Sequence, residues 1–194
     1  MTSKSFLLIL FVHFLANSLI GQDLSMQIEK HKSLNKKGIY VLGTWSSLNL
    51  ATGIYGNVTT QEERVKSFHQ MNWMWNSVNF VLASSSILSL KKYDEISSMA
   101  QLQERSKKMQ RIFLINTGLD IVYISAGTMM AAYSNRFDKP DQWKGYGQSV
   151  ALQGAFLFLF DGSMVLLNRK AEKRSLSQTA FQLKAMPNGL RLVF

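Results

Sequence analysis

The stretch Phe68-His69-Gln70-Met71-Asn72-Trp73-Met74-Trp75-Asn76-Ser77-Val78-Asn79 opens an apolar run that continues to Leu90. Its polar side chains include four at positions i, i+3, i+7 and i+10, a spacing that places them on one side of a helix. They belong to His69, Asn72, Asn76 and Asn79. Amides in a membrane-length segment must face protein, because lipid offers them no hydrogen-bond partner. We therefore expect this helix to pack against other helices that carry polar residues.

Four runs in the chain approach the roughly 20 mostly apolar residues that a membrane crossing requires. These predicted spans, none of which contains Lys or Arg, are residues 38–56, 71–90, 112–134 and 147–167. The sequence thus predicts an all-α fold, a polytopic transmembrane bundle with its four-helix domain at residues 38–168. In the first span, Gly43, Ser47 and Ala51 are spaced by four, which permits close contact with another helix.

The two ends of the chain lie outside this domain. Residues 1–21 hold one lysine and an apolar run, a pattern typical of a signal peptide or of a retained fifth membrane helix. Residues 22–37 are basic with spaced apolar positions, which is typical of a helix on the membrane surface or of a solvated linker. Residues 169–194 form a basic tail, whose alternating last five residues predict a short strand or an interfacial segment.

The chain carries a net charge of +10, and most of its 22 Lys and Arg residues lie in three segments on one side of the predicted membrane. These segments are residues 22–37, 91–111 and 168–194. The positive-inside rule places that side in the cytoplasm, whereas cleavage after residue 21 would leave it outside. The basic residues do not form a basic helix with interleaved aromatics, so we expect no nucleic-acid partner. The absence of cysteine excludes disulfides and thiolate metal sites.

Polar residues within the spans are expected to form one buried layer. Several lie about 10–17 Å from the same side, at ~1.5 Å per helical residue. The candidates are Trp45, Asn49, His69, Asn72, Asn76, Asn79, Asp120, Tyr123, Gln153 and Asp161. An acid near mid-membrane costs about 2.5–3.5 kcal/mol, so we expect Asn, Tyr or Trp donors for Asp120 and Asp161, and a proton on at least one. The layer serves either as packing between helices or as a site for a small solute, ion or proton.

Motifs typical of catalysis are absent from the sequence. It contains no phosphate-binding Gly-Lys-Ser/Thr loop, no paired-histidine zinc helix and no Gly-x-Ser-x-Gly elbow. The three histidines are far apart, and the aromatic residues near the span ends are expected to anchor helices at the membrane interface. We therefore expect neither an enzyme nor a bound cofactor or metal.

Several polar motifs carry a resemblance that covers the chain from about Leu34 to Asn168. They are Leu42-Gly43-Thr44-Trp45, Asn49, Phe68-His69-Gln70-Met71-Asn72, Trp75-Asn76, Asn79, Asn116-Thr117-Gly118-Leu119-Asp120, Tyr123, Gly127, Gly145-Tyr146-Gly147, Leu152-Gln153-Gly154 and Phe160-Asp161. The chain resembles an uncharacterised family of small bacterial four-span membrane proteins. The resemblance implies this architecture in the bacterial inner (cytoplasmic) membrane, and it implies no activity.

These observations predict an integral membrane protein with a structural or accessory role. Its expected partners are the lipid bilayer and, through the small-residue helix faces, a second copy or another protein. The alternative is binding or transport of a small solute, an ion or a proton through the polar layer.

Overall fold

The computed structural model describes the backbone of residues 3–185 and the side chains of residues 23–177. The elements in chain order are α1 (Ser3–Thr59), α2 (Glu63–Ser89), the 3₁₀ turn η1 (Leu90–Tyr93), α3 (Met99–Ala132), the 3₁₀ turn η2 (Ser134–Arg136) and α4 (Pro140–Ala185). Within residues 3–185 there is no strand, so the prediction of an all-α fold is confirmed.

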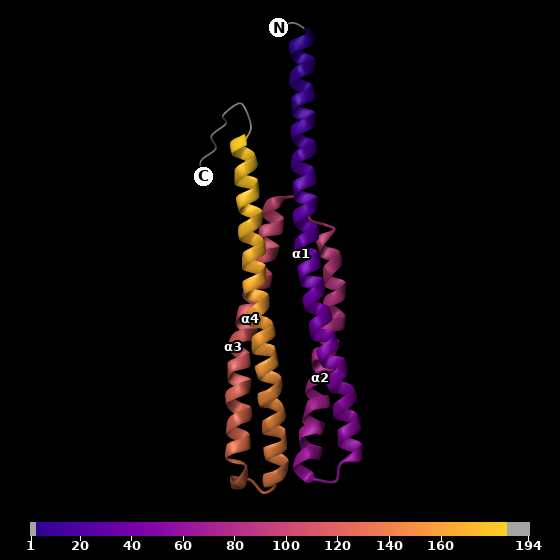
Figure 1. Ribbon diagram of the computed structural model, residues 1–194, viewed down its shortest axis with the longest axis vertical. Helices are drawn as coiled ribbons and strands as arrows, with labels where there is room; N and C mark the ends of the chain where they lie inside the picture. The colour runs from indigo at the N-terminus through magenta and orange to yellow at the C-terminus, as the bar shows by residue number, and fades with distance from the viewer. Residues whose placement is uncertain (1–2, 186–194) are drawn as a thin grey trace.

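The helices form two hairpins, α1 with α2 and α3 with α4, which lie side by side with their tight turns at the same end (Figure 1). Contacts between α2 and α4 join the hairpins. Residues 60–62 are enough to reverse the chain between α1 and α2. Pro140 is the first residue of α4, where its fixed φ suits a helix and its missing N–H costs no intrahelical bond. The sequence Asp138-Lys139-Pro140-Asp141, which is typical of a turn, therefore includes the start of α4.

The α3–α4 hairpin depends on backbone contact at two glycines. A Cβ added at Gly127 would lie 2.4 Å from the backbone nitrogen of Ala151, and one added at Gly147 would lie 2.5 Å from the nitrogen of Ala131. Both distances are far below van der Waals contact, so only glycine fits at either position. The two helices pack tightly because these positions lack side chains.

Helix α1 is longer than the predicted span that it contains. Its 57 residues give a length of about 85 Å at ~1.5 Å per residue. Both prolines of the chain lie at or beyond residue 140, so none interrupts the helix, and residues 22–37 continue directly into residues 38–56. The structure therefore has one helix where the sequence indicated a separate surface segment followed by a span. In Figure 1 the first turns of α1 extend beyond the other helices.

Polar side chains are concentrated inside the bundle, and large apolar ones outside it. Gln153 and Asn76 are 0% exposed, whereas Leu159 is 68% and Leu166 67% exposed. Among the described side chains, the buried polar residues outnumber the buried apolar residues. A water-soluble bundle has the opposite arrangement, with an apolar core and a polar surface.

Two described helices are long and apolar enough to cross a membrane, α3 (Met99–Ala132) and the Pro140–Ser177 part of α4. The predicted spans at residues 38–56 and 71–90 are not among them. Length and composition therefore mark two of the four predicted spans as candidates.

Candidate functional site: polar clusters inside the bundle

An amide network joins α1, α2 and α4. The indole N–H of Trp45 donates to Oε1 of Gln153 at 2.8 Å, and the Gln153 amide donates to Oδ1 of Asn72. The Asn72 amide in turn donates to Oδ1 of Asn49 at 3.1 Å. Asn76 donates to the Asn72 carbonyl at 2.8 Å, one turn along α2. The fold thus brings together five of the predicted site residues, from three helices.

Packing covers most of this network, although Trp45 and Asn49 are half-buried. The Trp45 ring stacks on Phe156 with a centroid distance of 3.9 Å, and Gln153 and Asn76 are fully buried. Within the described residues, two nearby amide atoms on α2 have no hydrogen-bond partner, Oδ1 of Asn76 and Nδ2 of Asn79. The network is therefore closed among its members except on the side that leads toward Asn79.

A pair of carboxyl groups forms a second cluster, between α3 and α4. Asp120 and Asp161 are buried and lie within hydrogen-bonding reach of each other, and the Asn116 side chain lies beside Asp161. Two carboxyl groups share a hydrogen bond only when one of them carries a proton. Oδ2 of Asp120 has no partner among the described residues. Asp161 is eight residues from Gln153, or about 12 Å along α4, so the single predicted layer is divided into two.

Among the described residues, neither Tyr123 nor His69 forms a side-chain hydrogen bond to a member of either cluster. The Tyr123 ring packs edge-on against Trp75 at 4.9 Å, and no described hydrogen bond joins it to the acids. His69 lies beside the α1–α2 turn, where its ring occupies the space that a Cβ at Gly56 would need. Of the Asn, Tyr and Trp side chains expected beside the acids, the structure places an asparagine, Asn116, next to Asp161.

A third cluster, which the sequence pattern did not predict, lies beyond the predicted spans. Asn35 donates to the hydroxyl of Tyr93 at 2.9 Å and to Oδ1 of Asn168 at 3.4 Å. Gln27 and His31, which lie two turns and one turn before Asn35, are also buried. We name Gln27, His31, Asn35, Tyr93 and Asn168 the outer cluster. Its sequence signal is the spacing by four of polar residues from Asp23 to Asn35, which also fits an exposed helix face.

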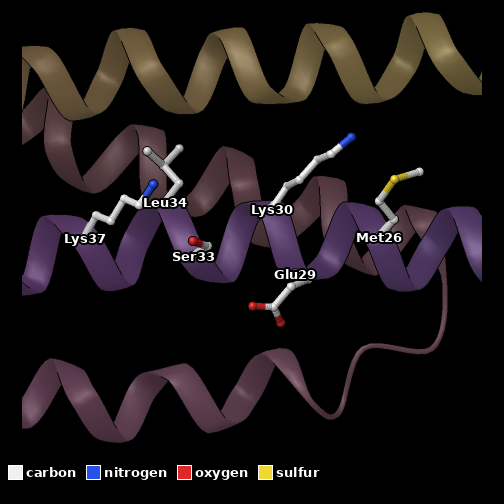
Figure 2. Close-up of a pocket in the computed structure, with 6 residues that line it drawn as sticks. All are labelled: Met26, Glu29, Lys30, Ser33, Leu34 and Lys37. Carbon is white, nitrogen blue, oxygen red and sulfur yellow. The ribbon is translucent and has the colours of Figure 1, made fainter.

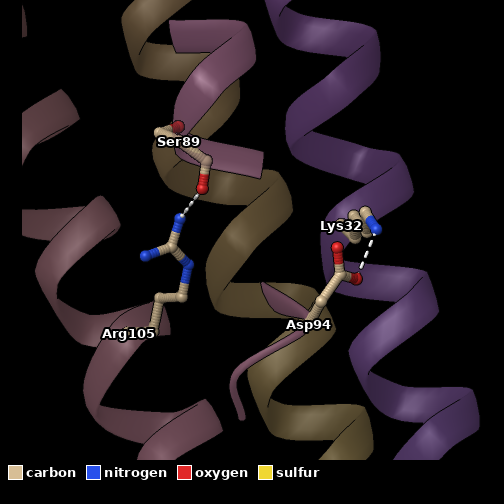
Figure 3. A network of polar contacts seen from close by, with 4 residues as sticks. All are labelled: Lys32, Ser89, Asp94 and Arg105. Carbon is tan, nitrogen blue, oxygen red and sulfur yellow. Dashed lines mark hydrogen bonds and ion pairs between the residues drawn. The ribbon is translucent and has the colours of Figure 1, made fainter. Parts of the chain in front are cut away.

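Charged side chains tie the α2–α3 connection to the helices beside this cluster (Figure 3). Nζ of Lys32 lies 2.6 Å from Oδ1 of Asp94, and this hydrogen bond raises the pKa of Lys32. The Arg105 guanidinium donates to the Ser89 carbonyl at 2.7 Å and lies 4.2 Å from the centroid of the Tyr93 ring. Burial raises the pKa of Tyr93, so this phenol stays neutral and hydrogen-bonded in the cluster.

His31 differs from the other members of the outer cluster. Burial lowers the pKa of its imidazole, and the nearby negative charge of Glu172 partly opposes that effect. Its Nδ1 has no hydrogen-bond partner in the described part of the chain. Nor do the described residues contain a group of three or more His, Asp or Glu placed to hold a metal ion. His31 is therefore a buried, electrically neutral group with unused hydrogen-bonding capacity.

The fold and these clusters define a small α-helical bundle of two hairpins with a polar interior and an apolar surface. The chain belongs to DUF6992, a family of unknown function, whose model matches residues 41–162. That range contains the amide network and the acid pair, whereas four of the five members of the outer cluster lie outside it. Neither the search of curated proteins nor the search of solved structures gave a match.

Proposed function

We propose that this chain is an integral membrane protein in which all four long helices cross the bilayer and the polar interior holds them together. The distribution of side chains carries this proposal: residues such as Leu159 and Val81 face outward, while Gln153 and Asp161 are buried. In lipid this arrangement is favourable, because apolar side chains meet acyl chains and polar groups pair with each other. As the resemblance implies, the membrane is the inner (cytoplasmic) membrane of a bacterium.

The role that fits the amide network best is structural or accessory. Its three interhelical hydrogen bonds run from Trp45 to Gln153, to Asn72 and to Asn49. Such bonds contribute on average about 0.6 kcal/mol each within a membrane, so together they contribute roughly 2 kcal/mol. Their geometry also selects one register of the two hairpins, because any axial slip separates donors from acceptors. The bundle would then act as a rigid membrane-embedded partner for another protein or a second copy.

A single-cysteine scan tests the membrane placement, since the natural chain has no cysteine. Thr59→Cys lies at the α1–α2 turn and Ser97→Cys in the α2–α3 connection, and both positions are exposed at opposite ends of the bundle. With a membrane-impermeant maleimide, we expect Thr59→Cys to react in intact cells and Ser97→Cys to react only after permeabilisation. Equal labelling of both in intact cells would contradict the proposal, as would recovery of the protein in the soluble fraction.

The length of α1 determines whether residues 1–21 can form a fifth span without a bend in the helix. The centre of the first apolar run and the centre of residues 38–56 are about 50 Å apart along the helix, whereas the hydrocarbon core is about 30 Å thick. A fifth span formed by the first run would therefore require a bend within residues 22–37. The mass of the mature protein from native membranes tests the other possibility, removal of a signal peptide.

A second candidate function is binding of a proton or small cation at the acid pair. The observation in its favour is the unpartnered Oδ2 of buried Asp120. Infrared difference spectroscopy tests this function, because loading the pair with sodium would displace its proton and remove a carboxyl C=O band. We expect the band in wild type and its loss in a double Asp120→Asn/Asp161→Asn variant. A carboxyl band that changes with neither pH nor sodium would contradict ion binding, and packing would then be the only role of the acid pair.

A further inference from the structure

A pocket of about 470 Å³ lies between α1 and α4, at the same end of the bundle as the outer cluster. Its lining residues are Gln27, Lys30, His31, Ala171, Arg174 and Ser177. His31 and Arg174 each lie seven residues beyond a predicted span, or about 10 Å along the helix axis. We name this cavity the α1–α4 pocket. It lies where a bundle crossing a membrane would meet the lipid headgroups and the water next to them.

The pocket has two cations that the described protein does not neutralise. Lys30 and Arg174 are exposed, come from different helices, and form no ion pair within residues 23–177. Figure 2 shows Lys30 extending from α1 toward α4, while Glu29 extends to the other side of α1. Two carboxylates near the pocket already accept hydrogen bonds from amides, Asp23 from Gln27 and Glu172 from Gln110. The pocket therefore presents positive charge from both walls.

His31 supplies an independent sign of a ligand. The residue is 2% exposed, it lines the pocket, and its Nδ1 has no partner among the described residues. Buried polar atoms in proteins are nearly always hydrogen-bonded, so an unpaired one calls for a specific explanation. His31 therefore gives the buried wall of the pocket an imidazole whose hydrogen-bonding capacity the described residues do not use.

We propose that the α1–α4 pocket binds a phosphate-type anion. Lys30 supplies a compact charge and Arg174 a planar donor fork, the two side chains that proteins use most to hold phosphate, and His31 adds a hydrogen bond from the buried wall. The same chemistry has two sources, the phosphodiester of an anionic phospholipid and a free phosphate ester in solution. The lipid source depends on the proposed membrane placement, whereas the free phosphate does not.

The test measures binding to the full-length protein purified in an uncharged detergent. The probes are inorganic phosphate and dihexanoyl phosphatidylglycerol, with chloride and dihexanoyl phosphatidylcholine as their controls at matched ionic strength. Binding is read as the rise of the unfolding temperature with probe concentration, which gives an apparent Kd. The pocket variant is Lys30→Gln/Arg174→Gln. The matched control is Lys92→Gln/Lys107→Gln, which removes the same charge from exposed positions on η1 and α3.

We expect at least one phosphate-bearing probe to bind more tightly than its control. Its Kd should rise at least tenfold in the pocket variant and less than twofold in the matched control. Binding of inorganic phosphate identifies the free-phosphate source, and binding of phosphatidylglycerol alone identifies a lipid headgroup. Equal weakening in both variants would overturn the proposal, because it would mean general charge attraction. Absence of binding by either probe would also overturn it.

A second measurement needs no folded pocket variant. The chain has three histidines, so ¹⁵N-histidine labelling gives a spectrum simple enough to follow His31 directly. Probe addition should shift the His31 ring resonances and leave those of His69, at the far end of the bundle, unchanged. A shift of both or of neither would refute the site. Neither result depends on the cysteine scan, so the pocket and the membrane placement are refuted separately.

Discussion

The substitution Gln153→Leu removes the residue through which α1 and α2 both bond to α4. It breaks the bonds to Trp45 and Asn72 but keeps a side chain of similar volume. Asn72 retains a donor, because Asn76 also reaches its Oδ1 at 3.3 Å, whereas the Trp45 indole N–H loses its described partner. Two interhelical bonds at about 0.6 kcal/mol each, plus about 1–3 kcal/mol for the unpaired N–H, give a loss of roughly 2–4 kcal/mol.

The assay is unfolding in mixed micelles of increasing SDS fraction, followed by tryptophan fluorescence. The matched control is Gln142→Leu, whose side chain bonds Tyr146 within the same helix at 3.1 Å, and we expect it to change the free energy of unfolding by less than about 1 kcal/mol. A double-mutant cycle with Trp45→Phe should give a coupling of at least about 0.5 kcal/mol. The reasoning is refuted if Gln153→Leu is no more destabilising than the control, or if the coupling is zero.

Three further predictions follow from other parts of the structure. Gly127→Val should destabilise the fold by more than about 3 kcal/mol or prevent folding, because its Cβ would meet the α4 backbone, and thermal unfolding of the purified protein measures this. Gly162→Ala should instead stabilise by about 0.5–1 kcal/mol in the same assay, because nothing lies within 4 Å of its added Cβ; a loss of stability would contradict the packing described. Since burial lowers the pKa of His31, the folded protein resists a proton that the unfolded chain takes up. The contribution of His31 to the free energy of unfolding should therefore be complete above about pH 6.5, the ordinary pKa of histidine. It should decline below that pH by at most about 1.4 kcal/mol per pH unit. His31→Gln should flatten that decline, and an unchanged pH profile in this variant would count against the argument.

The helices themselves follow from local pattern. The apolar runs, the polar stripe on residues 69–79 and the absence of proline before residue 140 are enough to predict an all-α chain. Helix lengths were harder to predict, because a polar segment such as residues 22–37 has no breaker and simply continues the helix. Whether such a segment is buried depends on what lies beside it, and α1 alone does not contain that information.

The composition of the polar clusters was only partly predictable. Helical spacing indicates which side chains share a face of one helix, and on α2 it correctly grouped Asn72 and Asn76. It does not indicate the rotation or axial offset of a neighbouring helix. For that reason one layer was expected where the structure has an amide network and a separate acid pair. The same spacing grouped His69 with these asparagines, and Tyr123 was expected near the acids, but the His69 ring lies beside Gly56 and the Tyr123 ring packs against Trp75.

The sequence by itself determined that the chain is helical, that long apolar runs alternate with basic segments, and that polar residues recur at helical spacing within those runs. Only the tertiary structure decided which of them meet: Gln153 with Asn72, Asp120 with Asp161, and Asn35 with Tyr93 and Asn168. The physical reason is that pairing between helices depends on their separation and offset. Backbone contact at glycines and the lengths of the turns set both, and these act between residues far apart in the chain.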